Sequence, residues 1–325
     1  MKLITYRTNN LQAHQIGVLQ NELISNLNNH FGNISLVELI QIDDYENKIA
    51  YLISNEDCIQ HELKDISILP PIPKPTSFRD AYAFREHVAT ARKNRGAEMT
   101  AEFDQFPVFY FSNHNAIFGD GNTIELMPDH FDKLDYELEF AIVIGKGGKN
   151  IKSKEADKHI AGFCILNDLS ARRLQMEEMK LNLGPAKGKD FANILGPYLV
   201  TSDELERYSI DTPFGKKYDL NMKCFVNNKL LSEGNAKDMN WTFAEIIERV
   251  SYGVELYPGD VIGSGTVGTG CLLELNGSKK NIDSNYREQW LKEGDEIEMQ
   301  IEGLGKITNK IVKSDSNHSL LKLKK

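Results

Sequence analysis

The stretch that decides the fold runs from Leu134 to Ile144 and reads LDYELEFAIVI. Its polar and apolar residues alternate with a period of two, which is typical of a β-strand whose two faces differ. One face carries only apolar side chains: Leu134, Tyr136, Leu138, Phe140 and Ile142. The other face begins with acids and then becomes apolar: Asp135, Glu137, Glu139, Ala141 and Val143. Because a solvated face seldom turns apolar along one strand, we expect the acidic end to open into a partly buried pocket.

Glu137 and Glu139 point to the same side of this predicted strand, about 7 Å apart. In a partly buried place their negative charges would repel each other. A hard cation between them would remove this conflict, and carboxylate oxygens suit Mg²⁺ or Ca²⁺. An amphipathic strand with a solvated acidic edge explains the same residues, so the stretch alone leaves both interpretations open.

A second acidic candidate, Asp168, follows the apolar run 162–166. A carboxylate at the end of a buried strand is either a site residue or the N-cap of the next helix. The helix predicted over 171–180 places Arg172 and Gln175 on one side, because residues three apart are neighbours on a helix. These two side chains either hold a substrate carboxylate or lie in water.

A third pair, Asp80 and His87, falls in the segment 80–93, which we predict to be a helix. A spacing of seven residues is two helical turns, so both side chains would share one face, whereas Tyr82 would not. A histidine beside a carboxylate is a candidate general base. With eight histidines in the chain, a chance encounter explains the pair equally well.

The segment from Gly263 to Gly268 spells G-x-G-x-x-G, the pattern of dinucleotide-binding loops. That fingerprint requires a strand before it, a helix after it and an acidic residue about 20 positions further on. The run 260–262 can supply the strand, but Asn276-Gly277-Ser278 interrupts the chain, and we expect no amphipathic helix there. We therefore expect no nucleotide cofactor, although successive backbone N–H groups in such a loop can hold an anionic oxygen.

The composition is that of an ordinary globular protein. The chain has 325 residues, of which 41% are hydrophobic and 26% charged, and its net charge of −9 disfavours binding to nucleic acid or to a membrane surface. The N-terminal MKLITYRTNN lacks the apolar run of a signal peptide. No C-x-x-C pair occurs, which argues against a cysteine zinc site or a disulfide framework; the cysteines are Cys58, Cys164, Cys224 and Cys271. We expect a cytoplasmic protein.

Four of the ten prolines fall between Leu69 and Pro75, which predicts an extended connector. Strands and helices do not alternate regularly on either side of it, so a doubly wound sheet is unfavourable. We expect an α+β, β-rich fold with a small N-terminal β-rich domain, a proline-rich linker and a larger mixed-β catalytic domain, over residues 1–68, 69–77 and 78–325. The predicted strands are 2–7, 15–20, 108–111, 136–144, 162–166, 220–226 and 296–301. The predicted helices are 36–40, 80–93, 154–159 (with Ser153 as N-cap), 171–180 and 242–252.

Five short motifs occur along the chain in a fixed order. They are Asp80-x-Tyr82-x₄-His87, Leu134-Asp135-x-Glu137-Leu138-Glu139, Asn167-Asp168-x-Ser170-Ala171-Arg172-x-x-Gln175, Gly188-Lys189-x-Phe191, and Pro258-Gly259-Asp260-Val261-Ile262-x-x-Gly265-Thr266. Together they resemble the fumarylacetoacetate hydrolase family, over roughly residues 78–275. The motif with Asp80 and His87 is most similar to the fumarylacetoacetase branch of that family.

The resemblance implies roles for particular residues. It implies one divalent metal ion, Mg²⁺ or Ca²⁺ with Mn²⁺ as a further option, held by Asp80, Glu137, Glu139 and Asp168. It implies that His87 activates water and that Glu274 orients this histidine. Further catalytic positions, which stabilise an oxyanion or hold the substrate, are matched by Lys189, Arg172 and Gln175. Substrate contacts are implied for Tyr82, Tyr110, Arg172, Gln175 and Thr266.

The resemblance also implies a fold and a reaction. The fold is a mixed β-roll preceded by a small SH3-like domain, usually assembled as a homodimer. The reaction is metal-dependent hydrolysis of a carbon–carbon bond in a β-diketo acid, fumarylacetoacetate- or acylpyruvate-like, as in aromatic amino acid catabolism. Decarboxylation of an oxaloacetate-type acid and dehydration of a 2-keto-3-deoxy sugar acid use the same metal–enolate scaffold and stay open. A catalytically silent metal-binding protein is the alternative of another class.

Met179 marks a departure from the family pattern. Fumarylacetoacetase has a tyrosine at this position, four residues after the helix glutamine. The segment 179–189 is also one residue longer than the corresponding loop. Losing a phenol removes one hydrogen bond to the substrate, so the identity of the substrate stays open.

Overall fold

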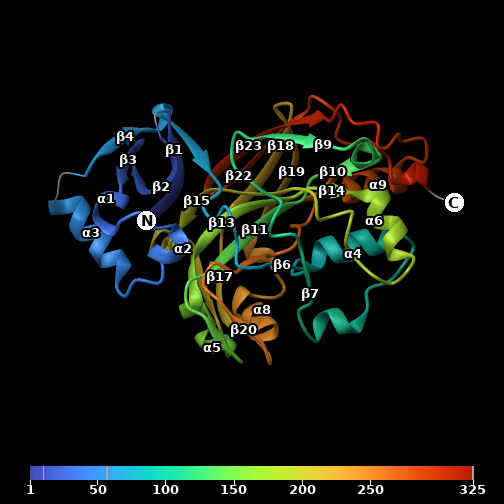
Figure 1. Cartoon of the computed structure of the whole chain (residues 1–325). Coiled ribbons are helices and arrows are strands. Elements are labelled where there is room, and N and C mark those ends of the chain that lie inside the picture. The colour runs from blue at the N-terminus through green and yellow to red at the C-terminus, as the bar shows by residue number, and fades with distance from the viewer. Residues whose placement is uncertain (10, 56–57, 324–325) are drawn as a thin grey trace.

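The computed structural model describes residues 1–9, 11–55 and 58–323. A twelve-stranded sheet runs through the molecule in the order β4-β3-β2-β1-β15-β13-β11-β21-β6-β7, with β5 paired to β1 and β8 paired to β15 (Figure 1). Its strands are β1 (Lys2–Thr8), β2 (Leu11–Gln20), β3 (Leu23–Asn26), β4 (Gln60–Glu62), β5 (Ile66–Leu69), β6 (Phe78–Ala81), β7 (Phe109–Phe111), β8 (Ile117–Phe118), β11 (Leu138–Ile144), β13 (Ile160–Asp168), β15 (Asn193–Val200) and β21 (Val261–Gly263).

A second sheet has five strands in the order β19-β18-β22-β23-β9. They are β9 (Thr123–Leu126), β18 (Asn221–Val226), β19 (Lys229–Asn235), β22 (Glu296–Ile301) and β23 (Gly305–Lys313). Three short pairs complete the strands: β10 (Leu134–Asp135) with β14 (Ser170–Ala171), β12 (Gly148–Lys149) with β20 (Glu255–Leu256), and β16 (Ser209–Thr212) with β17 (Gly215–Tyr218).

Short helices cover the sheets and connect their strands. The α-helices are α1 (Asn28–Phe31), α2 (Leu36–Leu39), α3 (Tyr45–Asn55), α4 (Arg85–Lys93), α5 (Ser153–Ala156), α6 (Arg172–Met179), α7 (Ser202–Leu205), α8 (Phe243–Val250) and α9 (Leu272–Ile282). The 3₁₀ turns are η1 (Leu63–Asp65), η2 (Ala101–Asp104), η3 (Pro128–Phe131), η4 (Asp157–His159), η5 (Glu206–Tyr208), η6 (Ala236–Asp238) and η7 (Leu321–Leu323). Within the described residues, no helix combines the length and the apolar character needed to cross a membrane.

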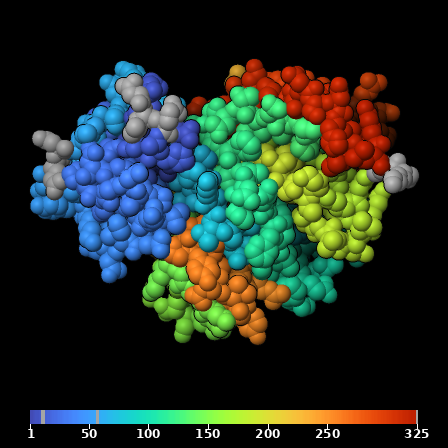
Figure 2. All heavy atoms as spheres, viewed as in Figure 1, coloured from blue at the N-terminus to red at the C-terminus, as the bar shows by residue number. Residues whose placement is uncertain are grey.

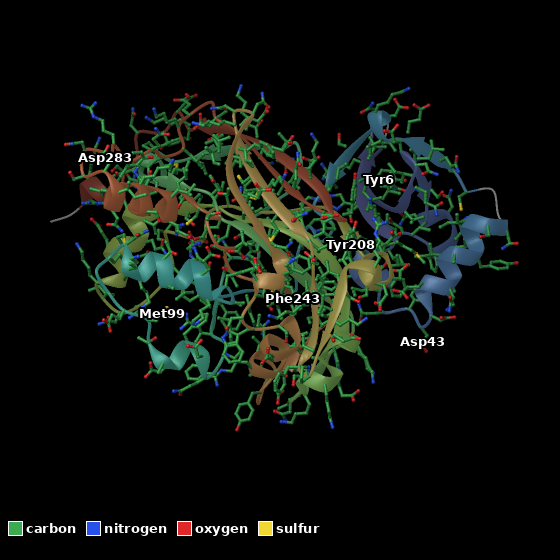
Figure 3. The ribbon with its side chains drawn as sticks, turned by 180° about the vertical axis from the view of Figure 1, so that it is seen from behind. Tyr6, Asp43, Met99, Tyr208, Phe243 and Asp283 are labelled. Atoms are coloured by element: carbon green, nitrogen blue, oxygen red, sulfur yellow. The ribbon has the colours of Figure 1, made fainter. Side chains whose placement is uncertain are left out.

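Strand β11 is buried on both faces, and its alternation divides the core. Leu138, Phe140 and Ile142 belong to the larger core, which also contains apolar residues of the five-stranded sheet and of α8. Ala141 and Val143 belong to a second core, which is completed by α2, α3 and the first strands of the chain. In Figure 3, Phe243 of α8 lies against the central strands. The β-rich α+β class is confirmed, and the period-two pattern of the sequence corresponds to two distinct packing layers.

The N-terminal residues form a lobe that is joined to the central sheet by backbone hydrogen bonds. Strand β1 pairs with β15 in antiparallel register, with Lys2 opposite Val200 and Leu3 opposite Leu199. Figure 2 shows this lobe in blue, on the side of the molecule opposite the C-terminal residues. Residues 70–77 connect β5 to β6 without helix or strand. The independence of residues 1–68 as an SH3-like domain stays a prediction.

Helix α3 and the segment 153–159 differ from the sequence-based outline. Helix α3 was not expected, although its buried Ile49 and Leu52 lie three apart on one face. The helix predicted over 154–159 is a single turn, α5, followed by the 3₁₀ turn η4. Ser153 does not cap it, because the preceding Lys152 occupies that position and the Ser153 N–H donates to the Glu248 carboxylate at 2.8 Å. A carboxylate from α8 therefore replaces the expected serine cap.

We expect Phe163→Ala to destabilise the protein by about 3–5 kcal/mol, because it removes a wholly buried ring from the larger core. Phe163 stacks on Phe140 with ring centroids 5.2 Å apart and meets Tyr218 edge-on at 4.8 Å. The measurement is the free energy of unfolding from urea denaturation. Phe214→Ala is the control, since Phe214 is 54% exposed and its loss should change that free energy by no more than about 0.5 kcal/mol. Equal effects of the two variants would contradict the packing described here.

Candidate active site

Four carboxylates converge at one end of the central sheet. Ligand oxygens of Asp80, Glu137, Glu139 and Asp168 lie within 4.8 Å of one another, and all four residues are buried. They come from three strands of the central sheet: β6 carries Asp80, β11 carries Glu139 and follows Glu137, and β13 ends at Asp168. The structure thus brings together the whole metal-ligand set that the sequence motifs predict.

Gly263 on β21 makes room for this convergence. Strand β21 lies between β11 and β6, and Gly263 stands opposite both Ala141 and Asp80. A Cβ at this position would lie 2.4 Å from Asp80 Oδ1 and 2.9 Å from Glu139 Oε2, which is closer than atoms can pack. Only a residue without a side chain lets carboxylates from the two flanking strands meet across β21.

The glycine-rich loop also supplies a hydrogen-bond donor to the cluster. The Gly265 N–H donates to Asp80 Oδ1 and to Glu139 Oε2, each at 3.1 Å. Gly265 has a φ of +78°, and a Cβ there would lie 2.6 Å from the Ala81 carbonyl oxygen. The loop therefore holds anionic oxygens of the protein itself, which explains these glycines without a nucleotide.

Two buried cations contact the carboxylates. The Lys189 ammonium lies 2.5 Å from Asp168 Oδ2 and also contacts Glu137 Oε2. The Arg172 guanidinium lies 2.7 Å from Glu137 Oε1. Burial alone would raise the pKa of Glu137, but Lys189 and Arg172 outweigh it and hold that pKa well below its ordinary value. Glu137 is thus ionised at any physiological pH.

The remaining carboxylates fit a divalent cation. Glu139 Oε1 and Asp168 Oδ1 are buried and have no hydrogen-bond partner in the described residues. Burial, with the nearby Asp168 charge, raises the pKa of Asp80 to about 7. Burial and the Asp80 charge raise the pKa of Glu139 well above its ordinary value. Unpartnered oxygens and raised carboxyl pKa values both mark a place that lacks positive charge, and an oxygen-only donor set suits Mg²⁺, Ca²⁺ or Mn²⁺.

A histidine–glutamate pair lies beside the cluster. His87 Nδ1 and Glu274 Oε2 are 2.7 Å apart, and both residues are buried. The other carboxylate oxygen, Glu274 Oε1, accepts a hydrogen bond from the Thr269 N–H at 3.0 Å. Because Nδ1 is engaged by the carboxylate, the tautomer with a free Nε2 lone pair is favoured, which is the form that accepts a proton.

The local structure around Asp80 differs from the helix predicted over 80–93. Asp80 lies on strand β6, which pairs in parallel with β21 and antiparallel with β7, and helix α4 begins only at Arg85. His87 lies in the first turn of α4. Asp80 and His87 therefore do not share a helical face, and that prediction was wrong. Pairing within a buried sheet outweighs the helical pattern at 80–84.

The expectation that Asn276-Gly277-Ser278 interrupts the chain after the glycine loop was also wrong. Helix α9 extends over Leu272–Ile282, through the segment 276–278 that was expected to end it. The buried Asp135 carboxylate accepts hydrogen bonds from the Leu272 N–H at 2.6 Å and from the Leu273 N–H at 3.0 Å. A carboxylate distant in the sequence thus satisfies the free N–H groups at the start of the helix, as an N-cap residue otherwise does.

These residues line one cavity of about 430 Å³. It lies among α4, α6 and α9, on the side of the molecule away from the N-terminal lobe (Figure 1). The predicted site residues in its wall are Asp80, Tyr82, His87, Tyr110, Glu137, Glu139, Arg172, Gln175, Lys189 and Thr266. Asp168 and Glu274 lie behind the wall, where each contacts a lining residue: Asp168 contacts Lys189, and Glu274 contacts His87.

The arginines that line the cavity differ in whether a carboxylate of the protein pairs with them. The Arg172 guanidinium contacts Asp135 at 2.7 Å, Glu137 at 2.7 Å and the Gln175 side-chain oxygen at 3.0 Å, so protein groups occupy it fully. Arg92 and Arg95 also line the cavity, and no carboxylate in the described part of the chain forms an ion pair with either. Sequence reasoning missed these two arginines. Arg92 lies in the last turn of α4, the helix that carries His87, and Arg95 lies in the turn that follows it; their spacing of three residues was the available signal.

The loop 179–187, which is held by hydrogen bonds to Glu178, forms the mouth of the cavity. The Glu178 carboxylate accepts hydrogen bonds from the backbone N–H groups of Ala186, Lys187 and Gly188, at 2.7–3.2 Å. The loop between carries Leu181 and Leu183, about four-fifths exposed. Met179, in place of the family tyrosine, lines the cavity. The mouth of the cavity is therefore apolar at this position.

Comparisons with known proteins agree with this geometry. The family model described as "Fumarylacetoacetate (FAA) hydrolase C-terminal" matches residues 76–312. An uncharacterized protein of Staphylococcus aureus (strain USA300) is 28% identical over 331 residues, which cover 96% of this chain and 100% of that protein.

Two solved structures are similar over almost the whole chain. The fumarylacetoacetate hydrolase of the psychrophilic Exiguobacterium antarcticum has a TM-score of 0.71 and 25% sequence identity, over 97% of this chain and 100% of that one. Maleylpyruvate hydrolase from Sphingobium sp. SYK-6, solved with manganese (II) ion and pyruvate, has a TM-score of 0.71 and 19% identity over the same shares. The second likeness is one of fold.

We expect chelation of divalent metal to lower the melting temperature, and to lower it more as the pH rises. Because the pKa of Asp80 is about 7 in the folded chain and 3.8 ordinarily, the metal-free fold binds a proton that the unfolded chain lacks between these values. The metal-free protein therefore loses stability as the pH rises from about 4 to about 7. A bound ion at a hundred times its Kd adds ~2.7 kcal/mol. Differential scanning fluorimetry with EDTA or with Mg²⁺, at about pH 5 and pH 8, measures the difference in melting temperature between the two samples at each pH. A difference that is smaller at pH 8 than at pH 5 contradicts the site.

Proposed function

The chain belongs to the fumarylacetoacetate hydrolase family, and on that premise we propose that it hydrolyses a carbon–carbon bond in a β-diketo acid with water activated by His87. The observation that carries the proposal is that the His87–Glu274 pair lies in the same cavity as the four-carboxylate cluster. A metal site alone would serve enolisation, whereas a histidine with a fixed tautomer beside it provides a base for water.

The four carboxylates of the cluster would hold the metal ion. When bound there, the ion supplies Lewis acidity that polarises the substrate carbonyl groups and stabilises enolate charge. Mg²⁺, Ca²⁺ and Mn²⁺ all suit oxygen ligands, and a relative of the same fold was solved with manganese (II) and pyruvate. The two unpartnered oxygens, Glu139 Oε1 and Asp168 Oδ1, are ready to act as ligands without breaking existing hydrogen bonds.

His87 begins the reaction as a general base. Its free Nε2 takes a proton from water, and the water oxygen forms a bond to the carbonyl carbon next to the scissile bond. The carbonyl π electrons move to its oxygen. When they return, the carbon–carbon bond breaks and its electron pair passes to the departing enolate, whose carbon then takes the proton from the His87 imidazolium. Glu274 stabilises the imidazolium that forms after the first proton transfer, because its carboxylate already accepts the Nδ1 hydrogen bond.

Lys189 and Gln175 are placed to stabilise the oxyanion. Burial lowers the pKa of Lys189, but Asp168 and Glu137 outweigh it and hold that pKa above its ordinary value, so the ammonium stays protonated. The Gln175 oxygen accepts a hydrogen bond from Arg172 at 3.0 Å, which leaves its NH₂ group free to donate into the cavity. Donors fixed before the reaction are the most effective stabilisers of developing charge.

The substrate end of the cavity suggests a second anionic group. Tyr82, Tyr110 and Thr266 would contact the diketo acid near the metal, and Arg92 and Arg95 would bind a carboxylate at its far end. Arg172, which the family motif assigns to the substrate, would instead hold Glu137 and Gln175 in place. A homodimer, a cytoplasmic location and a role in aromatic amino acid catabolism stay predictions.

We expect His87→Ala to lower the rate of carbon–carbon cleavage on the order of 10²–10⁴-fold, the usual contribution of a general base. Metal affinity should hardly change, because His87 is outside the carboxylate cluster. Steady-state kinetics on a panel of acylpyruvates with saturating Mg²⁺, and isothermal titration with the metal, measure the two quantities separately.

Two further variants serve as controls for this prediction. Asp168→Ala should weaken metal binding and activity together, and Glu274→Gln should give an intermediate rate with unchanged metal affinity. Wild-type cleavage by His87→Ala would refute the role of the histidine. Decarboxylation or dehydration of keto acids, fully retained in that variant, would favour the alternative chemistries on this scaffold.

We expect Arg95→Met to raise KM about 10–100-fold for acylpyruvates that end in a carboxylate, because a charged hydrogen bond contributes roughly 1.5–3 kcal/mol. KM for acylpyruvates that end in a methyl group should stay the same. Arg173→Met is the matched control, since Arg173 lies on α6, pairs with Glu177 at 3.2 Å and does not line the cavity. A KM that changes equally for both substrates would exclude Arg95 as the carboxylate-binding residue.

A further inference from the structure

A second group of metal-ligating atoms lies at the histidine–glutamate pair. A ring nitrogen of His87, the Cys271 Sγ and a carboxylate oxygen of Glu274 lie within 4.8 Å of one another. All three residues are buried, and Cys271 is wholly so. None of the three belongs to the four-carboxylate cluster.

Two helices and one backbone bridge assemble this group. His87 lies in the first turn of α4, Glu274 lies in the first turn of α9, and Cys271 is the residue that caps α9. An isolated β-bridge between Cys271 and Glu137 fixes the backbone of the cysteine beside the carboxylate cluster. The thiol is therefore held at the base, and its position follows from the same strands that position the metal ligands.

The donor types of the two groups differ. The carboxylate cluster offers only oxygen, which favours hard cations such as Mg²⁺ and Ca²⁺. The second group offers nitrogen, sulfur and oxygen, which is the mixed set that zinc prefers in proteins, with three protein ligands and one position left for water. The spacing of the cysteines in the sequence gave no sign of this mixed group, because His87 lies far along the chain from Cys271 and Glu274.

We propose that His87, Cys271 and Glu274 form a thiophilic inhibitory site that binds Zn²⁺. As the S–Zn bond forms, the Cys271 thiol loses its proton to solvent; the neutral imidazole contributes a nitrogen lone pair, and Glu274 contributes an oxygen of its ionised carboxylate. Of the three ligands only His87 lines the cavity, so the ion would enter from the cavity past the His87 ring. Once bound, zinc withdraws both members of the pair from proton transfer. The inhibition rests on the proposed function; the binding does not.

The first experiment measures inhibition by Zn²⁺ of the enzyme saturated with Mg²⁺, so that the carboxylate cluster is already filled. Cys271→Ser should raise the zinc concentration for half-inhibition by about tenfold or more, because a sulfur ligand is lost. Cys224→Ser is the matched control: Cys224 is equally buried but lies outside both groups, and zinc should inhibit it as it inhibits the wild type. Equal inhibition of the wild type and Cys271→Ser would overturn the proposal.

The second experiment does not depend on turnover. Co²⁺ replaces zinc as a spectroscopic probe, and a thiolate–cobalt bond gives a charge-transfer band in the near ultraviolet that carboxylate ligands cannot give. We expect the band in the wild type and in Cys224→Ser, and its absence in Cys271→Ser and Cys271→Ala. A wild-type protein without the band overturns the proposal whatever the variants do. A band in a protein that cleaves no diketo acid would keep the site and refute the proposed function.

Discussion

Burial of like charge is the constraint on which the rest of this structure depends. Four carboxyl groups lie within 4.8 Å of one another, away from water, and their mutual repulsion is strong in such a medium. Lys189 and Arg172 contact these carboxyl groups but do not neutralise their charge, because Arg172 also forms an ion pair with Asp135. The raised pKa of Asp80 and the unpartnered Glu139 and Asp168 oxygens are two expressions of this shortage of positive charge. A divalent ion bound in this place would act on folding and on chemistry at once.

The sheet meets this constraint with backbone as much as with side chains. Strands β6, β11 and β13 deliver the acids, and the bare Cα of Gly263 on β21 lets them meet. The Gly265 N–H then donates to two of the carboxylates, so the loop that resembles a nucleotide fingerprint stabilises protein anions. Asp135 continues the network outward, because it holds both Arg172 and the first turn of α9, which carries Glu274. The four-carboxylate cluster and the His87–Glu274 pair are thus connected through the buried Asp135.

Local periodicity and the order of the motifs were enough to predict the central strand and the acidic residues of the site. The alternation at 134–144 predicted a strand, which the structure has over Leu138–Ile144 as β11, and the five motifs identified the acids that the fold brings together. Asp80 was misplaced on a helix because its strand pairs with β21, far along the chain. Helix α9 was missed because the carboxylate that satisfies its first N–H groups comes from Asp135, 137 positions earlier. Arg92 and Arg95 became visible only once the direction of α4 was known. The errors at Asp80 and α9 thus both reflect contacts between distant segments.

The loop that Glu178 holds has a consequence for how such an enzyme diversifies. Because one carboxylate fastens both ends of the segment 179–187, residues between them can be exchanged or added without moving Lys189 or the strands behind it. Selection can therefore change the mouth of the cavity independently of the four-carboxylate cluster. Substrate range and reaction chemistry would then evolve on separate tracks, one in an exposed loop and the other in a buried sheet.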